Sequence, residues 1–227
     1  AQSATGVQGL LVPDAVASEG FTDVAGLREL QDGRVLLVDP QERRIVLLGS
    51  DLAHQAEVGR QGQGPGEFLL PHRLFPLGTD TTAVVDRQNG RIVLLVGSSP
   101  LSRHMDLGGG PGCPGGAPVR LASIEASDGT GNLYFTLTSP QAVQILRWRP
   151  GSCADEAEPV TSIPGRGGQD MGGGIILGGE LPPPLGPEHA WAVDPGGRVA
   201  VVHPAPWQVE ITLPDGQRVT GPVIEHD

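Results

Sequence analysis

The sequence predicts an all-β fold of the β-propeller type, made of about four four-stranded antiparallel sheets. Two observations predict it: a segment that repeats within the chain, and short apolar runs separated by turn-forming residues. Glycine and proline supply 35 and 22 of the 227 residues, and they gather between apolar runs such as 34–39 and 92–96. Many short strands joined by tight turns are expected from this pattern.

The repeat is the most informative feature of the chain. Residues 38–48 align without a gap with residues 85–95, and eight of the eleven positions are identical. In each copy an apolar strand ends in an aspartate, Asp39 or Asp86, and after a four-residue connection an arginine opens the next strand. We expect each aspartate to accept hydrogen bonds from its own turn and to pair with that arginine across the hairpin. The predicted role of both aspartates is structural, not catalytic.

Weaker copies of the pattern follow at the turns 128–132 and 194–197. They divide the chain into four units, at 21–68, 69–111, 117–165 and 186–222. A spacing of about 45–60 residues with four short strands per unit is typical of propeller blades. A Gly/Pro-rich insertion is expected at 164–187, and residues 1–20 form an N-terminal segment in which 7–12 is a candidate ring-closing strand.

The glycine-rich segment 58–68, VGRQGQGPGEF, closes the first unit. It resembles the linker between blades of NHL-like and bacterial six-bladed β-propellers, in particular a secreted group, and the Phe21…Asp23-Val24 opening and the run 198–202 are similar as well. The resemblance covers most of residues 20–222. It implies the fold and says almost nothing about function, because one fold hosts unrelated activities.

Within this linker the glycines are expected to allow a sharp crossover while Phe68 fills the gap between two sheets. Helical periodicity is missing downstream, which argues against a phosphate-binding loop. Six-bladed relatives are longer than this chain, so the four units imply either an incomplete six-bladed ring or a closed ring of four or five blades. An open arc would leave the apolar flank of the last sheet uncovered, which invites a partner. The insertion 164–187 folding over that flank is a further alternative.

Charge and composition exclude several classes of function. The formal net charge is −11 and the basic residues are scattered singly, which argues against a nucleic-acid partner. The chain contains no lysine, which excludes Schiff-base and P-loop lysine chemistry. No apolar run approaches the roughly 20 residues that span a bilayer. The start at 1–4 resembles that of an exported protein after signal-peptide removal, so a periplasmic or extracellular location is expected.

Cys113 and Cys153, the two cysteines, lie in Gly/Pro/Ser-rich loops without a C-x-x-C pair or neighbouring histidines, which argues against a zinc site. Two loop cysteines of an exported protein commonly form a disulfide, and two free thiols are the alternative. The six histidines show no metal-binding spacing. Because propeller metal sites draw ligands from distant blades, His72 and His203 are the best candidates, although ordinary histidines are the favoured interpretation. No catalytic, cofactor-binding or metal-binding residue is therefore assigned.

These observations predict a non-enzymatic, extracytoplasmic module. It would act as a protein-binding or structural accessory subunit of a larger assembly, with a membrane complex on its periplasmic face as one candidate partner. Two alternatives stay open. One is a metal-dependent propeller enzyme of the lactonase or lyase kind, and the other is a ligand-sensing ectodomain.

Overall fold

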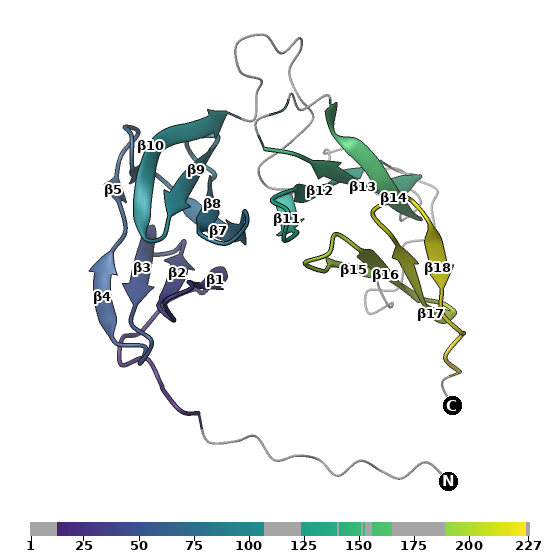
Figure 1. Ribbon diagram of the computed structural model, residues 1–227, viewed down its shortest axis with the longest axis horizontal. Helices are drawn as coiled ribbons and strands as arrows, with labels where there is room; N and C mark the ends of the chain where they lie inside the picture. Colours follow the sequence, from purple (N-terminus) through teal and green to yellow (C-terminus); the bar gives the residue numbers. More distant parts are fainter. Residues whose placement is uncertain are drawn as a thin grey trace, which may run out of the picture.

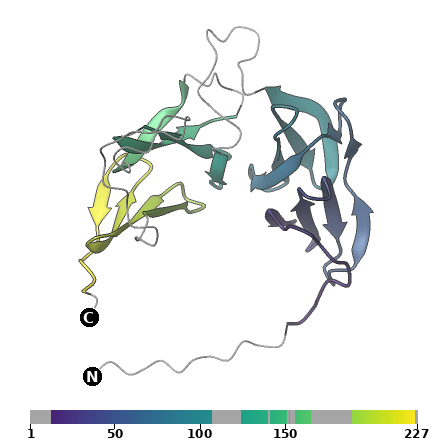
Figure 2. The same ribbon diagram turned by 180° about the vertical axis from the view of Figure 1, so that it is seen from behind.

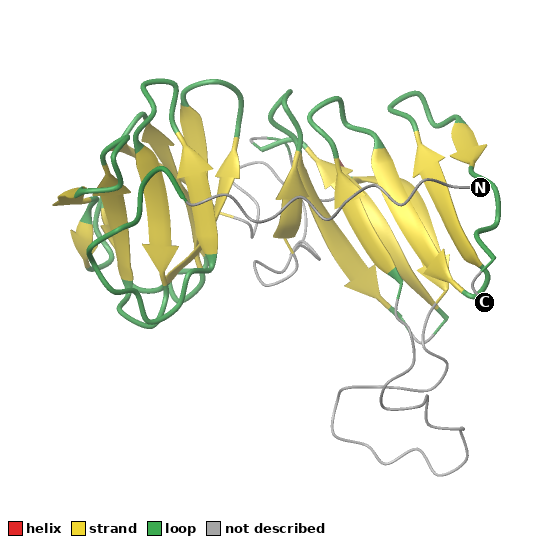
Figure 3. Ribbon diagram, turned by 90° about the horizontal axis from the view of Figure 1, so that it is seen from below, coloured by secondary structure: helices red, strands yellow, loops and turns green. Residues whose placement is uncertain are grey.

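The computed structural model describes residues 13–106, 124–139, 141–150, 152, 156–164 and 189–225. These residues form four antiparallel four-stranded sheets and contain no α-helix, which confirms the predicted all-β, propeller-type fold. Figure 3 shows only strands and loops in this part of the chain.

Each sheet is a meander, in which strands adjacent in sequence are hydrogen-bonded neighbours. Sheet 1 contains β1 (Gly26–Glu29), β2 (Val35–Asp39), β3 (Arg44–Leu48) and β4 (His54–Glu57). Sheet 2 contains β7 (Pro71–Pro76), β8 (Thr81–Asp86), β9 (Arg91–Val96) and β10 (Ser99–Asp106). Sheet 3 contains β11 (Ile124–Ser127), β12 (Leu133–Thr138), β13 (Ala142–Trp148) and β14 (Glu158–Pro164). Sheet 4 contains β15 (Ala190–Val193), β16 (Val199–Pro204), β17 (Trp207–Thr212) and β18 (Arg218–Thr220).

The four sheets follow one another along an arc (Figure 1). Their first strands, β1, β7, β11 and β15, lie on the inner side of the arc, and their last strands lie on the outer side. The view from behind shows the same order, with sheets 1 and 4 at the two ends (Figure 2). Between sheets 1 and 2 a short parallel pair, β5 (Arg60–Gln61) and β6 (Glu67–Phe68), forms the linker.

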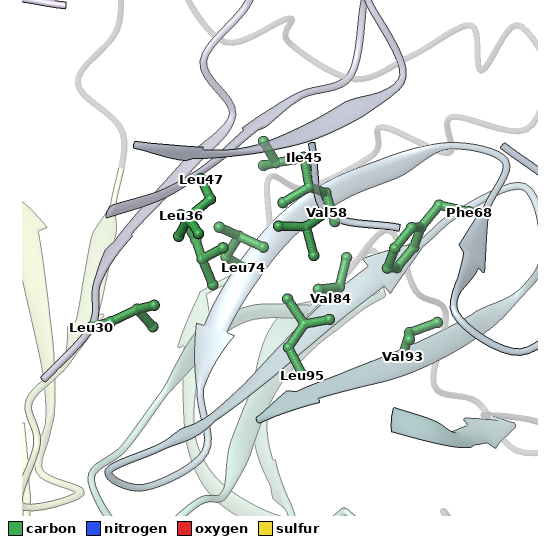
Figure 4. Packing of buried hydrophobic residues seen from close by; sticks show 11 residues of the cluster. Leu30, Leu36, Ile45, Leu47, Val58, Phe68, Leu74, Val84, Val93 and Leu95 are labelled. Atoms are coloured by element: carbon green, nitrogen blue, oxygen red, sulfur yellow. The ribbon is translucent and has the colours of Figure 1, made fainter. Parts of the chain in front are cut away.

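Apolar side chains fill the three spaces between consecutive sheets. Because side chains alternate between the two faces of a strand, each sheet presents one apolar set to the sheet before it and another to the sheet after it. Between sheets 1 and 2 these include Leu36 and Ile45 on one side and Leu74 and Val84 on the other (Figure 4). Phe68 lies in this cluster and is 3% exposed, which confirms that it fills the gap between the two sheets.

The repeated aspartates are buried and bind backbone amides, as expected for a structural role. Asp86 accepts hydrogen bonds from the amides of Leu69 and Leu70 and lies 3.7 Å from Arg91 Nε. Asp39 accepts from the amides of Thr22 and Glu42. The expected pairing across the hairpin is wrong for Asp39, because its arginine turns to another carboxylate.

That arginine, Arg44, donates from Nη1 to Glu19 at 2.5 Å and from Nη2 to the carbonyl of Gly20. In the second copy Arg91 likewise donates to the linker backbone, including the carbonyl of Glu67. The arginine of each copy therefore forms hydrogen bonds with the segment that leads into its own sheet.

Candidate functional site

The repeat seen in the sequence extends through the whole of sheets 1 and 2. Adding 47 to the residue numbers of β1, β2 and β3 gives positions within β7, β8 and β9. The same shift takes Phe21 to Phe68, and Thr22, which donates its amide to Asp39, to Leu69, which donates to Asp86. Residues 20–22 thus occupy the same place before sheet 1 as residues 67–69 before sheet 2, although the strand pair β5–β6 has no equivalent in the described residues that precede sheet 1.

This equivalence identifies the face of sheet 1 that points away from sheet 2. We call it the leading face; its apolar residues are Phe21, Leu27, Val35, Leu37, Val46 and Leu48, and Glu29 and Glu57 lie on it too as the strand partners of Val35 and Val46. Leu37, Val46 and Leu48 are buried with Phe21 against them. Leu27, however, is 61% exposed, whereas its equivalent Leu74 is 7% exposed because sheet 1 covers it.

Sheet 4 repeats sheet 1 at a constant offset of 164 residues. β1 maps onto Ala190–Val193, and the pairing of Val38 with Ile45 maps onto the pairing of Val202 with Val209. The residues of sheet 1 that pack on sheet 2 therefore have direct counterparts in sheet 4, and these counterparts point away from sheet 3.

We call this second surface the trailing face. It consists of Ala192, Ala200, Val202, Trp207, Val209, Ile211, Val219 and Ile224. Leu36, Val38, Ile45 and Leu47 of sheet 1 are at most 5% exposed, but their counterparts in sheet 4 are only partly buried. Trp207 is 43% exposed, Val219 51% and Ile224 60%. An apolar sheet face is therefore open at this end of the arc.

The eight residues of the trailing face are all apolar, but a charged pair lies at its edge, where Asp194, the counterpart of Leu30, pairs with Arg198 at 2.5 Å. On β17 and β18 the charged residues Glu210 and Arg218 alternate to the opposite face, where their side chains pair at 3.5 Å. Central regions of protein interfaces are likewise depleted in charge and enriched in aromatic residues such as tryptophan. The composition of this face matches that of an interface.

The two histidines predicted as the best metal candidates lie on different sheets. His72 lies on β7, and burial, assisted by Arg87 and Arg73, lowers its pKa. His203 lies on β16, where it pairs with Gln208, and its ring meets that of His189 edge-on, with ring centroids 5.1 Å apart. Burial and, to a smaller extent, the neighbouring His203 lower the pKa of His189. Among the described residues no group of three or more potential metal ligands lies together.

The His189–His203 contact was not predicted, although the register offers a signal for it. Ala190 pairs with Val202, so positions 189 and 203 are the next pair of this ladder. Cys113 and Cys153 lie outside the described residues, as do the candidate strand 7–12 and nearly all of the insertion 164–187. The disulfide stays a prediction.

A cavity of about 410 Å³ opens beside sheet 3, and its lining includes Asn132, Arg147, Arg149, Glu156 and Glu158. Arg147 and Glu158 pair at 2.6 Å. The arginine and glutamate charges that line the cavity offset each other, so the cavity favours neither an anionic nor a cationic ligand. Among the described residues there is no helix that is long and apolar enough to cross a membrane.

No family model and no curated protein matches the chain. Among solved structures it is similar to β-propeller-type proteins. A streptogramin B lyase is 15% identical with a TM-score of 0.44, over 89% of this chain and 55% of that one. A virginiamycin B lyase from Staphylococcus aureus is 14% identical with a TM-score of 0.43, over 88% and 56% of the two chains. A structure of the nidogen/laminin complex matches at 18% identity and a TM-score of 0.45, over 87% and 64%.

This chain therefore spans about 55% of the length of the two lyases. Likenesses at such low identity and TM-score indicate no function. The propeller-type fold rests on the four sheets themselves, and the candidate site rests on the partly exposed trailing face of sheet 4.

Proposed function

We propose that this chain is a non-enzymatic protein-binding module that acts outside the cytoplasm as an accessory subunit of a larger assembly. One observation carries the proposal: the residues of the trailing face are apolar and partly or largely exposed, although the equivalent residues of sheet 1 are buried against a neighbouring sheet. We also propose that the chain is related to NHL-like propellers and that it is located outside the cytoplasm.

The physical argument is the cost of leaving such a face in water. Burying apolar surface contributes about 25 cal/mol per Å², so covering several aliphatic side chains and a tryptophan is a substantial driving force. Contiguous exposed apolar patches on folded proteins commonly mark interaction sites. Trp207 would be the anchor, because tryptophan is enriched among the residues that dominate binding energy.

The test is co-purification from the source organism with matched variants. Tagged wild-type chain should retain a defined, stoichiometric set of proteins, and Val219→Glu should lose them because it places a charge on the trailing face. Val96→Glu is the matched control, since Val96 is 45% exposed and lies on sheet 2, away from both end faces. Retention of the same proteins by Val219→Glu would contradict the proposal.

The metal-dependent enzyme makes a different prediction. It requires stoichiometric Ca²⁺ or Zn²⁺ in the purified protein, and elemental analysis of the same preparations measures this. A bound metal that survives Val219→Glu, together with unchanged co-purification, would favour that alternative.

A further inference from the structure

The turn between β8 and β9 contains the one Asn-Gly step of the chain, Asn89-Gly90. We propose that Asn89 is a site of spontaneous deamidation, and that the acid formed there loosens the contact between sheet 2 and the linker 60–68. The modified turn belongs to the junction of sheets 1 and 2, so the modification is independent of the trailing face. Water is the co-reactant.

Deamidation begins when the backbone nitrogen of Gly90 loses its proton and attacks Cγ of Asn89. The bond between that nitrogen and Cγ forms, the bond between Cγ and Nδ2 breaks, and the side-chain amide group leaves as ammonia. Water then opens the cyclic imide at either of its carbonyl groups. One product is an aspartate with the original backbone, and the other is an isoaspartate, in which the backbone runs through the former side chain.

The turn leaves the attacking nitrogen accessible. Gly90 is exposed, and no atom lies within 4 Å of a Cβ built on it. In the first copy of the repeat the equivalent amide, that of Arg43, donates to the carbonyl of Pro40 at 3.3 Å, whereas the Gly90 amide donates to no described residue. Because glycine has no side chain, it neither shields the nitrogen nor restricts the rotation that ring closure requires.

The side-chain amide that this reaction removes makes two hydrogen bonds. Asn89 Nδ2 donates to Asp86 Oδ2 at 2.6 Å and to the carbonyl of Gly62, within the linker, at 3.1 Å. Asp86 is fully buried and also accepts from the amides of Leu69 and Leu70, which follow the linker. Asn89 therefore connects the turn of sheet 2 to the linker both directly and through Asp86.

An acid at position 89 removes these donors and adds a charge. A carboxylate is an acceptor only, so it would face two further acceptors, the Asp86 carboxylate and the Gly62 carbonyl. Two carboxylates at this range repel each other. The new group must therefore turn towards water, and its contact with the linker is lost. An isoaspartate also lengthens the backbone of the turn, which displaces it further.

The first copy of the repeat shows what an acid needs at this position. Glu42 stands 47 residues before Asn89, and its carboxylate accepts a hydrogen bond from Thr22 Oγ1 at 2.8 Å. The counterpart of Thr22 is Leu69, which has no hydroxyl. The acid formed at position 89 would therefore lack the donor that the equivalent acid of sheet 1 has.

Peptide mass spectrometry of the wild-type protein, incubated for days in mildly alkaline buffer, tests the modification. Asn132, the only other asparagine, is the internal control, because Leu133 follows it and its amide donates to Asp128 at 2.8 Å. Asn89 should deamidate faster by roughly tenfold or more, the factor that a barrier difference of about 1.4 kcal/mol produces. Gly90→Ala should slow the reaction at Asn89 and leave Asn132 unchanged.

Hydrogen exchange of the linker tests the consequence. The amides of Gly62 and Gly64 donate within the linker, at 3.0 and 2.7 Å. They should lose protection in the deamidated fraction, separated by ion exchange, and in Asn89→Asp. Asn89→Glu should lose protection as well. Adding Leu69→Thr to Asn89→Glu recreates the Thr22–Glu42 pair of sheet 1 and should restore part of the protection.

Two outcomes would overturn the inference. If Asn89 deamidates no faster than Asn132, the turn is not a modification site. If the linker amides exchange equally in the wild type, in Asn89→Asp and in the deamidated fraction, the acid does not loosen the linker. Neither outcome affects the proposed function, because no variant used here lies on the trailing face.

Discussion

Arg28 of sheet 1 donates a hydrogen bond of 2.8 Å to the side-chain hydroxyl of Thr82 in sheet 2. The same guanidinium donates to the backbone carbonyls of Gly78, Thr79 and Thr81. Burial lowers the pKa of Arg28, which is 8% exposed. One arginine thus ties a turn of the second sheet to the first strand of the first sheet, at the edge of an otherwise apolar interface.

We predict that Arg28→Met lowers the free energy of unfolding by about 2 kcal/mol, because the Thr82 hydroxyl and three part-buried carbonyls lose a charged donor. Thr82→Val should cost about 1 kcal/mol, because Arg28 keeps its backbone partners. Urea unfolding of the two single variants and the double variant measures their coupling. Strictly additive costs would show that the hydrogen bond between Arg28 and Thr82 contributes nothing of its own.

A second prediction uses two equivalent turn positions. Arg43 has φ of 55°, and Gly90, 47 residues later, has φ of 66°. A side chain in the left-handed region costs roughly 1 kcal/mol, whereas glycine adopts it freely. Arg43→Gly should therefore stabilise the protein by about 0.5–1 kcal/mol, and Gly90→Ala should destabilise it by a similar amount.

No atom lies within 4 Å of a Cβ built on Gly90, so the second change tests the backbone alone. Thermal unfolding at matched concentration gives both values. Equal changes of the same sign would contradict the explanation by backbone conformation.

Asp128 is expected to make the stability of sheet 3 depend on pH. Burial opposes its charge, but hydrogen bonds from Asn132, Thr130 and Tyr134 outweigh it and hold the pKa below the ordinary value. The Tyr134 hydroxyl donates to Asp128 Oδ2 at 2.9 Å. Burial and, to a smaller extent, this hydrogen bond raise the pKa of Tyr134.

Because the pKa of Asp128 is lower in the folded state, its contribution is present above the unfolded value of about 3.9 and is lost as the pH falls below it. Asp128→Asn should lower the free energy of unfolding at neutral pH by about 2 kcal/mol. On acidification, the free energy of unfolding should fall less for this variant than for the wild type, because the variant has no carboxylate to protonate at position 128. Urea midpoints at neutral and acidic pH measure both effects. Parallel pH profiles for the two proteins would refute the assignment.

The disulfide between Cys113 and Cys153 would close a loop of about 40 residues and contribute roughly 4 kcal/mol in the chain-entropy model. Without reductant, alkylation under denaturing conditions should modify neither cysteine. After reduction, both should react and the melting temperature should fall. Modification of both thiols in the unreduced protein would exclude the bond.

The fold could be predicted because its signals are local. Alternating apolar residues mark the strands, and turns such as Asn89-Gly90 mark the hairpins. The repeat also predicted equivalent structural roles for Asp39 and Asp86. The partner of Arg44 could not be predicted in this way, because Glu19 lies 25 residues away and meets it only when the entering segment folds back.

The candidate site was predicted only in outline. An uncovered flank of the last sheet follows from an open arc, but its residues depend on strand register and on which face of sheet 4 meets sheet 3. Val199 and Val201 alternate with Ala200 and Val202, and both sets are apolar, so the sequence alone does not distinguish the buried set from the exposed one.

The gap-free offset of 47 residues has a consequence for how such a chain can grow. Residues 21–67 begin at Phe21, contain all of sheet 1 and stop immediately before Phe68, the equivalent starting point of the next unit. A tandem duplication of the corresponding DNA would therefore insert one whole four-stranded sheet, with the seam inside the two-residue strand β6, where Glu67 would again be followed by a phenylalanine. The contact between the two copies of sheet 1 would be new: Arg28 would face Val35 there in place of Thr82, so the added contact would lack the hydroxyl that accepts its hydrogen bond in the parent.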